Sequence, residues 1–147
     1  MVLYIAKKDS PQPIRLMSSV GKQLPLYCTG LGRALLAYKS EEEIRSLFPE
    51  VLTAYTPHTI ATINDLLKEL ELTRQRGYAV EHEETNLMVN CIAVSLDYNN
   101  APIAALSISI PTFRISESKE KEAVQILWEA KQHIETHFKM YGVDFGN

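Results

Sequence analysis

Two neighbouring segments late in the sequence carry small polar side chains that could bind a polar ligand. The residues from Asn90 to Ile110 alternate in type on either side of Asn99-Asn100, which predicts two strands joined by a tight turn. Side chains alternate across a strand, so Cys91 shares a face with small residues, and Ser107 and Ser109 do the same in the second strand. The opposite face of both strands is bulky and apolar, and we expect it to pack under the long helices.

The pairing of these two strands decides whether the polar side chains meet. A two-residue loop at Asn99-Asn100 would place residues from opposite faces against each other. A three-residue loop over 99–101 pairs Cys91 with Ser109 and keeps both faces consistent, and Asn tolerates the left-handed conformation that such a loop needs. We therefore expect a three-residue loop and a cluster of Cys91, Ser107 and Ser109.

Three explanations of this small face remain open. Solvent exposure is the first, although solvent faces usually carry Lys, Glu or Thr rather than Ala, Cys and Ser. The second is close approach of another backbone. The third, which we favour, is a concave site for a ligand.

The segment Thr29-Gly30-Leu31-Gly32 precedes a predicted helix and could bind an anion. Backbone amides at a helix start are unpaired and carry a partial positive charge, and glycine lets a ligand approach the backbone. Together these features can hold a carboxylate, although a plain tight turn also explains the glycines. The spacing matches neither a phosphate-binding P-loop nor the Gly-x-Gly-x-x-Gly fingerprint, because Arg33-Ala34-Leu35 follows the second glycine.

Other residues could support catalysis or metal binding. Cys91 could be a nucleophile with His82 as its base, or Glu81 could be a general base, but catalysis needs a positioned pair and no nucleophile motif is present. Zinc sites usually have closely spaced ligand pairs, whereas Cys28, His58, His82 and Cys91 are spread along the chain. We therefore expect neither a catalytic site nor a metal.

The elements that would position these side chains follow from capping and periodicity signals. Thr29, the capping box at Ser40 and Thr62 each mark a helix start, and Gly77 marks a helix end. Helices are predicted over 29–38, 40–47, 62–77 and 116–141, and strands over 2–6, 14–19, 78–81 and the two segments described above. Strands grouped around helices, with a hairpin late in the chain, indicate an α+β fold rather than a βαβ series.

The composition limits the classes of partner. The 147 residues carry a formal net charge of -3, and no basic run is longer than Lys7-Lys8. A domain that neutralises several phosphates normally shows a basic face, so we do not expect this segment to bind nucleic acid. Because the sequence shows neither a membrane span nor a signal peptide, we expect a cytoplasmic chain in which Cys28 and Cys91 are free thiols.

Four sequence blocks, taken in order, resemble the effector domain of IclR-type bacterial transcription regulators. The blocks are PLYCTGLGRALLA at 25–37, Arg76-Gly77-Tyr78 with Glu83-Glu84, Cys91-Ile92-Ala93-Val94, and Ala105-Leu106-Ser107-Ile108-Ser109. The resemblance implies one GAF-like α+β domain over residues 1–147, with a central, mostly antiparallel sheet and helices packed around it. It also implies a DNA-binding winged helix-turn-helix domain that is missing from this chain, which fits the abrupt start of the first predicted strand.

The resemblance also implies a site for small organic acids between the helix-start loop and the sheet. By position, the effector contacts fall on Gly30, Leu31, Glu81, Cys91, Ser107 and Ser109. Weaker candidates for the pocket lining are Leu16, Ala93 and Ala105. At four positions this chain departs from the residue that is frequent in the family. Leu31 stands in place of a small residue, and Glu81 stands in place of Asp. Met88 stands in place of Gly, and Ser95 stands in place of Pro. The first two of these departures would reduce the pocket volume.

The function that we expect is ligand sensing for a transcription regulator, without catalysis. A keto, hydroxy or sugar acid would bind in the pocket and shift the arrangement of subunits in a dimer or tetramer, and DNA would be bound only through the missing domain. We expect no metal, no cofactor and no membrane partner. A ligand-free dimerisation module remains an alternative, and so does a small enzyme that uses Cys91.

Overall fold

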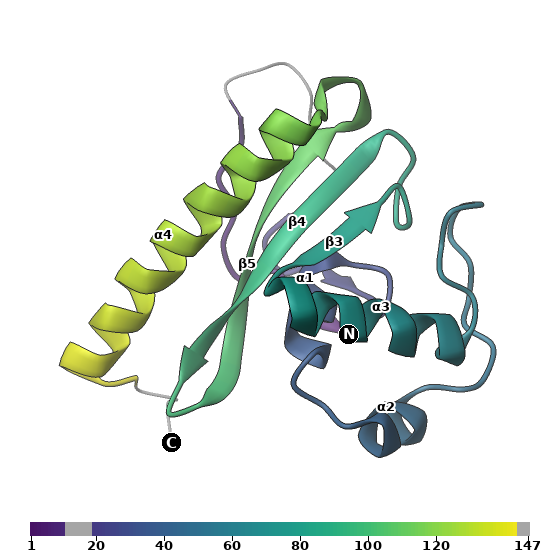
Figure 1. The fold of residues 1–147 in the computed structure, drawn as a ribbon, viewed down its shortest axis with the longest axis horizontal. Coiled ribbons are helices and arrows are strands. Elements are labelled where there is room, and N and C mark those ends of the chain that lie inside the picture. The colour runs from purple at the N-terminus through teal and green to yellow at the C-terminus, as the bar shows by residue number, and fades with distance from the viewer. Residues whose placement is uncertain (11–18, 144–147) are drawn as a thin grey trace.

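A three-stranded antiparallel sheet forms the centre of the structure (Figure 1). This computed structural model describes residues 1–10 and 19–143. The strands are β3 (Ala79–His82), β4 (Val89–Tyr98) and β5 (Ala101–Pro111), which lie in the order β3-β4-β5. The predicted α+β class with an antiparallel central sheet is therefore confirmed.

The two faces of this sheet are covered by different helices. Helix α4 (Glu117–Tyr141) packs along the bulky face, where Ile92 and Val94 are almost fully buried in a cluster with Leu127. Helix α1 (Gly30–Leu36) approaches the small face. Although α4 is long, no helix in the described part of the chain combines the length and apolarity needed to cross a membrane.

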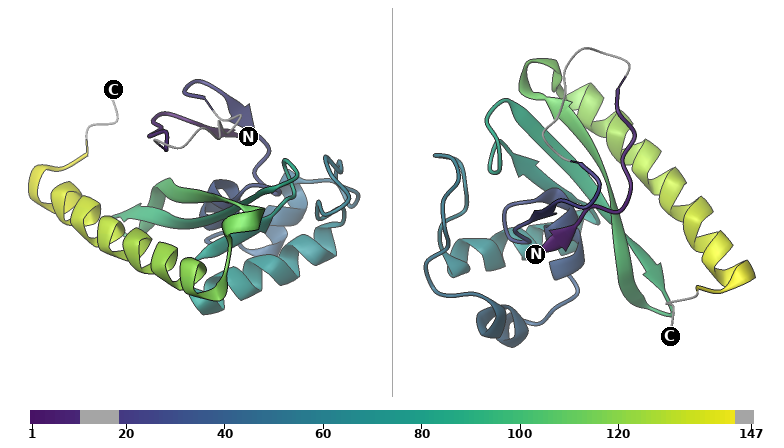
Figure 2. Two further views of the ribbon diagram at one scale, coloured as in Figure 1. Left: turned by 90° about the horizontal axis from the view of Figure 1, so that it is seen from above. Right: turned by 180° about the vertical axis from the view of Figure 1, so that it is seen from behind.

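The remaining elements lie beside the sheet. Helices α2 (Glu41–Leu47) and α3 (Ile63–Arg76) contribute to a second apolar core with residues that precede α1. A short 3-10 helix, Thr112–Arg114, leads from β5 to α4. A two-stranded ribbon of β1 (Val2–Leu3) and β2 (Gln23–Leu24) forms a separate layer on the side of the central sheet opposite α4 (Figure 2).

Capping geometry confirms the helix starts that the sequence predicts. The side chains of Thr29, Ser40 and Thr62 each accept a hydrogen bond from an amide in the first turn of the helix that follows. The first strand is shorter than expected, because pairing is confined to Val2–Leu3. Most of the strand predicted over 14–19 lies outside the described residues.

The β4–β5 hairpin has the predicted register but not the predicted loop. Cys91 pairs with Ser109, as expected. The loop, however, contains only Asn99-Asn100, both with positive φ (52° and 64°), which is typical of a type I′ turn. Ile103 is an extra residue in a β-bulge, and this insertion restores the register that a two-residue loop would otherwise shift. The three-residue loop was therefore a wrong prediction.

The close approach of α1 explains part of the small face. A Cβ atom added to Gly30 would lie 3.3 Å from the Cβ atom of Ala93 and 3.4 Å from that of Cys91. A Cβ atom at Gly32 would lie only 2.1 Å from the backbone oxygen of Leu26, so this position requires glycine. Small residues beneath the first turn of α1 are therefore a packing requirement.

Candidate functional site

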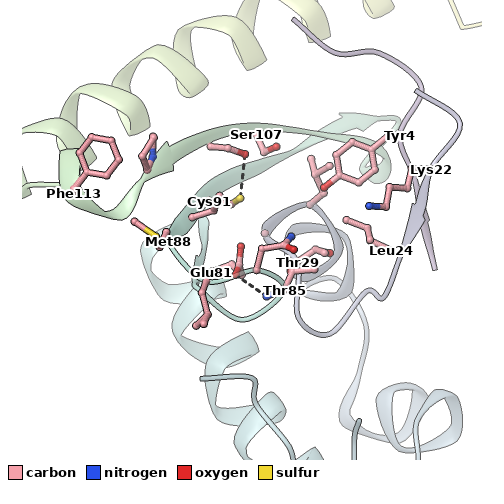
Figure 3. A pocket seen from close by; sticks show the side chains of 17 residues that line it. Tyr4, Lys22, Leu24, Thr29, Glu81, Thr85, Met88, Cys91, Ser107 and Phe113 are labelled. Carbon is pink, nitrogen blue, oxygen red and sulfur yellow. Dashed lines mark hydrogen bonds between the residues drawn. The ribbon is translucent and has the colours of Figure 1, made fainter. Parts of the chain in front are cut away.

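A cavity of about 500 Å³ lies between the start of α1, the small face of the sheet and the ribbon (Figure 3). Its volume falls within the range of small-molecule sites in proteins. All six residues expected to contact an effector line this cavity: Gly30, Leu31, Glu81, Cys91, Ser107 and Ser109. The structure therefore brings together side chains and backbone from α1, β3, β4 and β5.

The weaker lining candidates lie elsewhere. Ala93 and Ala105 belong to an apolar cluster beneath α1 and do not line the cavity. Leu16 lies outside the described residues. Leu31 takes part in both regions, because it packs in the apolar cluster and also borders the cavity.

The thiol of Cys91 and the hydroxyl of Ser109 meet on the sheet side of the cavity. Their Sγ and Oγ atoms lie 3.1 Å apart. Burial raises the pKa of the Cys91 thiol, which therefore stays protonated at neutral pH. Together with Ser107 on the same face, this part of the wall offers neutral groups that can donate and accept hydrogen bonds.

Glu81 brings a carboxyl group into the cavity from β3. The residue is only 2% exposed, and its Oε1 atom accepts hydrogen bonds from the backbone amides of Glu84 at 2.5 Å and Thr85 at 3.2 Å. Burial raises the pKa of this carboxyl more than the two hydrogen bonds lower it. The loop after β3 thus fixes the position of Glu81 without supplying a cation to compensate its charge.

The start of α1 adds backbone donors to the cavity. The Thr29 hydroxyl donates to the backbone oxygen of Pro25 at 2.9 Å and accepts from the amide of Gly32 at 3.1 Å. Within residues 1–10 and 19–143, the amides of Gly30 and Leu31 have no hydrogen-bond acceptor. Both residues border the cavity, so an oxygen atom of a ligand could accept from them.

A buried ion pair holds α1 in this position, and sequence reasoning missed it. Arg33 is only 1% exposed, and its guanidinium donates to the two carboxylate oxygens of Glu84 at 2.6 and 2.5 Å. The same guanidinium donates to the backbone oxygens of Tyr27 and Val80, each at 2.9 Å. The pair therefore ties α1 to β3 and to the loop that positions Glu81. No local pattern links two residues 51 positions apart.

Sequence reasoning also missed the residues that close the cavity on its other sides. The ribbon and the residues that adjoin its strands supply Tyr4, Lys22 and Leu24. The loop after β3 and the end of β5 supply Thr85, Asn86, Leu87, Met88, Val89, Pro111 and Phe113. Strand and helix periodicity describes each element alone, so it carries no signal of where the ribbon lies relative to the sheet.

The described residues form neither a pair of Cys91 with His82 nor a metal site that includes Cys91. His82 pairs with Asn90, one strand position away from Cys91, so its side chain points to the opposite face. The His82 Nδ1 atom instead lies 3.1 Å from Oδ1 of Asn90. No group of three His, Cys, Asp or Glu side chains that could hold a metal ion occurs in the described residues, where Cys28 and Cys91 are free thiols.

Comparisons with known proteins show the family of this chain. The family model described as "Bacterial transcriptional regulator IclR C-terminal" matches residues 1–136. The HTH-type transcriptional regulator KdgR of Dickeya chrysanthemi is 39% identical over 135 residues, which cover 90% of this chain and 44% of the relative. KdgR of Escherichia coli K12 is 35% identical over 146 residues, or 98% of this chain and 56% of the relative. The chain thus spans about half the length of the curated relatives that it matches.

Solved structures show the same fold. The Thermotoga maritima IclR structure superposes with a TM-score of 0.85 at 34% identity and covers 96% of this chain and 57% of that one. A double mutant of the PobR inducer-binding domain from Acinetobacter, in complex with 3-hydroxybenzoic acid, has a TM-score of 0.74 at 28% identity. That match covers 86% of this chain and 77% of the PobR domain.

Proposed function

This chain belongs to the IclR family, as the C-terminal domain of a bacterial transcriptional regulator with a GAF-like fold, and from this premise we propose that it senses a small organic acid. One observation carries the proposal: the six residues expected from the family pattern converge on one cavity of about 500 Å³. The double mutant of the PobR domain, a relative in fold and sequence, is in complex with 3-hydroxybenzoic acid, which is a hydroxy acid. We infer that the effector of this chain is a keto, hydroxy or sugar acid.

The effector carboxylate would bind where the cavity offers hydrogen-bond donors. The free amides of Gly30 and Leu31 and the hydroxyls of Ser107 and Ser109 can donate to its oxygens. Glu81 would face a hydroxyl group of the effector, because a second carboxylate beside this buried carboxyl would be repelled. The Oε1 atom of Glu81 already accepts two backbone amides, so Oε2 is the oxygen for that hydroxyl.

The consequence for regulation follows from linkage. An effector changes the arrangement of subunits only if it binds one arrangement more tightly than another. We propose that the effector acts in this way on a dimer or tetramer of a longer cytoplasmic protein. In this proposal, residues 1–147 form the sensing domain, and a winged helix-turn-helix domain outside this chain binds DNA.

Two alternatives are weaker on physical grounds. A ligand-free dimerisation module has no use for a cavity of this size that is lined by polar groups. An enzyme that uses Cys91 as nucleophile would need a thiolate, whereas burial raises the pKa of this thiol and His82 points to the other face of the sheet. Our proposal therefore excludes catalysis, metal and cofactor.

A thermal-shift screen tests the proposed function. The chain would be heated with pyruvate, D-glycerate, D-gluconate or D-glucuronate, which are keto, hydroxy and sugar acids of two different lengths. A ligand that binds only the folded state raises the melting temperature, and the rise increases with the ratio of its concentration to its dissociation constant. We expect at least one acid to raise it and the corresponding neutral polyols, glycerol and sorbitol, to leave it unchanged. Equal shifts with acids and polyols would contradict a carboxylate site.

A further inference from the structure

The ribbon of β1 and β2 forms one side of the cavity. It lies on the side of the central sheet opposite α4, as a layer of its own (Figure 2). It contributes Tyr4, Lys22 and Leu24 to the cavity lining. Val2 fixes the ribbon to the molecule, because this residue is buried in the apolar cluster beneath α1.

Tyr4 presents a hydrogen-bond donor to the cavity from the side of the ribbon. Its side chain is half-buried, and Figure 3 shows its hydroxyl pointing into the cavity. Within the described residues, no hydrogen bond of this hydroxyl occurs, whereas the hydroxyl of Tyr27 donates to the backbone oxygen of Thr53 at 2.7 Å. Burial, with smaller contributions from Cys91 and Glu81, raises the pKa of Tyr4 to about 12. The Tyr4 hydroxyl is therefore a donor at neutral pH.

We propose that Tyr4 is an effector contact that determines specificity, and that its hydroxyl donates to an oxygen atom of the bound acid. This inference rests on the proposed function, because it names a further residue of the same site. A hydroxyl donor that faces a cavity can bind a ligand oxygen there, and an acid in the cavity would supply one. The acceptor would be reached from the ribbon, across the cavity from the sheet that carries Ser107 and Ser109.

The chemical class of the effector follows from the two sides of the cavity. We assign the effector carboxylate to the amides of Gly30 and Leu31, and we assign to Tyr4 a further oxygen on the same molecule. A simple aliphatic acid lacks that oxygen, whereas a keto, hydroxy or sugar acid has it. The residue would therefore discriminate between acids with and without a second oxygen function.

A bound effector would also hold the ribbon in place. The ribbon contains only two paired positions, and two-stranded ribbons are marginally stable alone. Its backbone hydrogen bonds run from the Tyr4 amide to the Lys22 oxygen at 3.0 Å and from the Gly21 amide to the Tyr4 oxygen at 2.8 Å. An effector that accepts from Tyr4 should slow the opening of both bonds.

The test compares Tyr4→Phe with the wild-type chain by calorimetric titration of whichever acid of the screen gives the largest thermal shift. The substitution removes one hydroxyl and keeps the ring, so we expect the affinity to fall about tenfold. The matched control is Tyr27→Phe, which also removes one hydroxyl but lies outside the cavity lining, and should bind as the wild type does. Butyrate, an acid with no oxygen beyond its carboxylate, should bind Tyr4→Phe and wild type alike.

Hydrogen exchange supplies a second readout that a structural role of Tyr4 would not produce. The bound acid should slow exchange at the amides of Tyr4 and Gly21 in the wild-type chain but not in Tyr4→Phe. If Tyr4→Phe binds the acid as tightly as wild type while Ser107→Ala with Ser109→Ala weakens binding, the role of Tyr4 is refuted and the proposed function stands. If no acid of the screen binds, the proposed function fails and the role of Tyr4 fails with it.

Discussion

The small face of β4 and β5 carries similar residues at its two ends, but only one end borders the cavity of about 500 Å³. The cavity end holds Cys91, Ser107 and Ser109, and the hairpin end holds Ser95 and Asp97. Both ends combine small side chains with hydroxyl groups, so residue type alone does not distinguish them. The difference lies in what the rest of the protein brings to each end.

At the hairpin end, the protein supplies its own hydrogen-bond partners. The Tyr38 hydroxyl donates to Oδ2 of Asp97 at 2.6 Å and lies 3.0 Å from Oγ of Ser95. Lys131 in α4 donates to the backbone oxygen of Ser95 and to Oδ2 of Asp97, both at 2.8 Å. The Asp97 amide donates to Glu135 at 2.8 Å. Among buried side-chain polar atoms of the described residues, Oδ1 of Asp97 alone lacks a partner.

At the cavity end, the nearest buried cation is committed elsewhere. Arg33 lies in α1 directly after the cavity residues, but its guanidinium faces away and binds Glu84. The amides of Gly30 and Leu31 therefore remain available to a ligand. Lys131 and Tyr38 thus contact the polar side chains of the hairpin end, whereas the guanidinium of Arg33 is held away from the cavity end.

The largest expected effect comes from breaking the ion pair that maintains the cavity end. Arg33→Met leaves the carboxylate of Glu84 buried without its partner, so the free energy of unfolding should fall by about 3–5 kcal/mol. Lys131→Met at the hairpin end should cost only about 1 kcal/mol, because this ion pair is partly exposed to solvent. Urea unfolding monitored by far-UV circular dichroism measures both.

A double substitution separates charge burial from packing in this experiment. Arg33→Met combined with Glu84→Met removes both charges, so it should recover a large part of the stability lost in Arg33→Met alone. No recovery would mean that the loss comes from the hydrogen bonds of the two side chains to the backbone, which join Arg33 to Tyr27 and Val80 and Glu84 to the amide of Ile60. Equal losses for Arg33→Met and Lys131→Met would refute the contrast between the two ends.

A smaller effect is expected on binding when the hydroxyls of the cavity end are removed. Ser107→Ala with Ser109→Ala should weaken the affinity for the acid found by the screen by about 1–3 kcal/mol, or about 5- to 150-fold, because each hydrogen bond contributes about 0.5–1.5 kcal/mol. Ser95→Ala removes the same hydroxyl at the hairpin end and should leave affinity unchanged. Calorimetric titration measures these affinities. Equal affinities in wild type, the double variant and Ser95→Ala would exclude the hydroxyls of Ser107 and Ser109 from the site.

The sequence predicts well whatever depends on local rules. Helix starts at Thr29, Ser40 and Thr62 follow from side-chain capping, which involves residues three positions apart. The pairing of Cys91 with Ser109 follows from the requirement that each face stay consistent. The loop prediction failed although the register was right, because a β-bulge and a two-residue loop together give the same register as a three-residue loop.

Interactions between distant segments could not be predicted in this way. Arg33 and Glu84 form their ion pair only after α1 and the end of β3 have packed together. Tyr4 reaches the cavity only because the ribbon crosses the small face, and the alternation within one strand does not say which sheet it joins. The family resemblance predicted six of the residues that line the cavity. It did not predict the lining residues that lie outside the central sheet, such as Tyr4 and Lys22.

The carboxyl groups of the two ends have pKa shifts of opposite sign. Burial of Asp97 would raise its pKa, but hydrogen bonds from Lys131 and Tyr38 outweigh this effect and lower the pKa below the ordinary value of 3.8. Burial of Glu81 outweighs its hydrogen bonds and raises its pKa above the ordinary value of 4.5. The protein compensates the negative charge at the hairpin end and leaves it uncompensated at the cavity end.

The smallest expected effect is therefore a pH dependence of opposite direction at the two ends. The ionised Asp97 stabilises the fold, and this contribution is complete above pH 3.8 and is lost as the pH falls through its lower native pKa. The ionised Glu81 destabilises the fold, and this cost grows as the pH rises from 4.5 to its higher native pKa. Urea unfolding between about pH 3 and 8 should thus show Glu81→Gln gaining on wild type as pH rises, and Asp97→Asn approaching wild type as pH falls. A constant stability difference for Glu81→Gln across this range would show that the cavity carboxyl is already compensated, and the reason for placing an effector hydroxyl beside it would disappear.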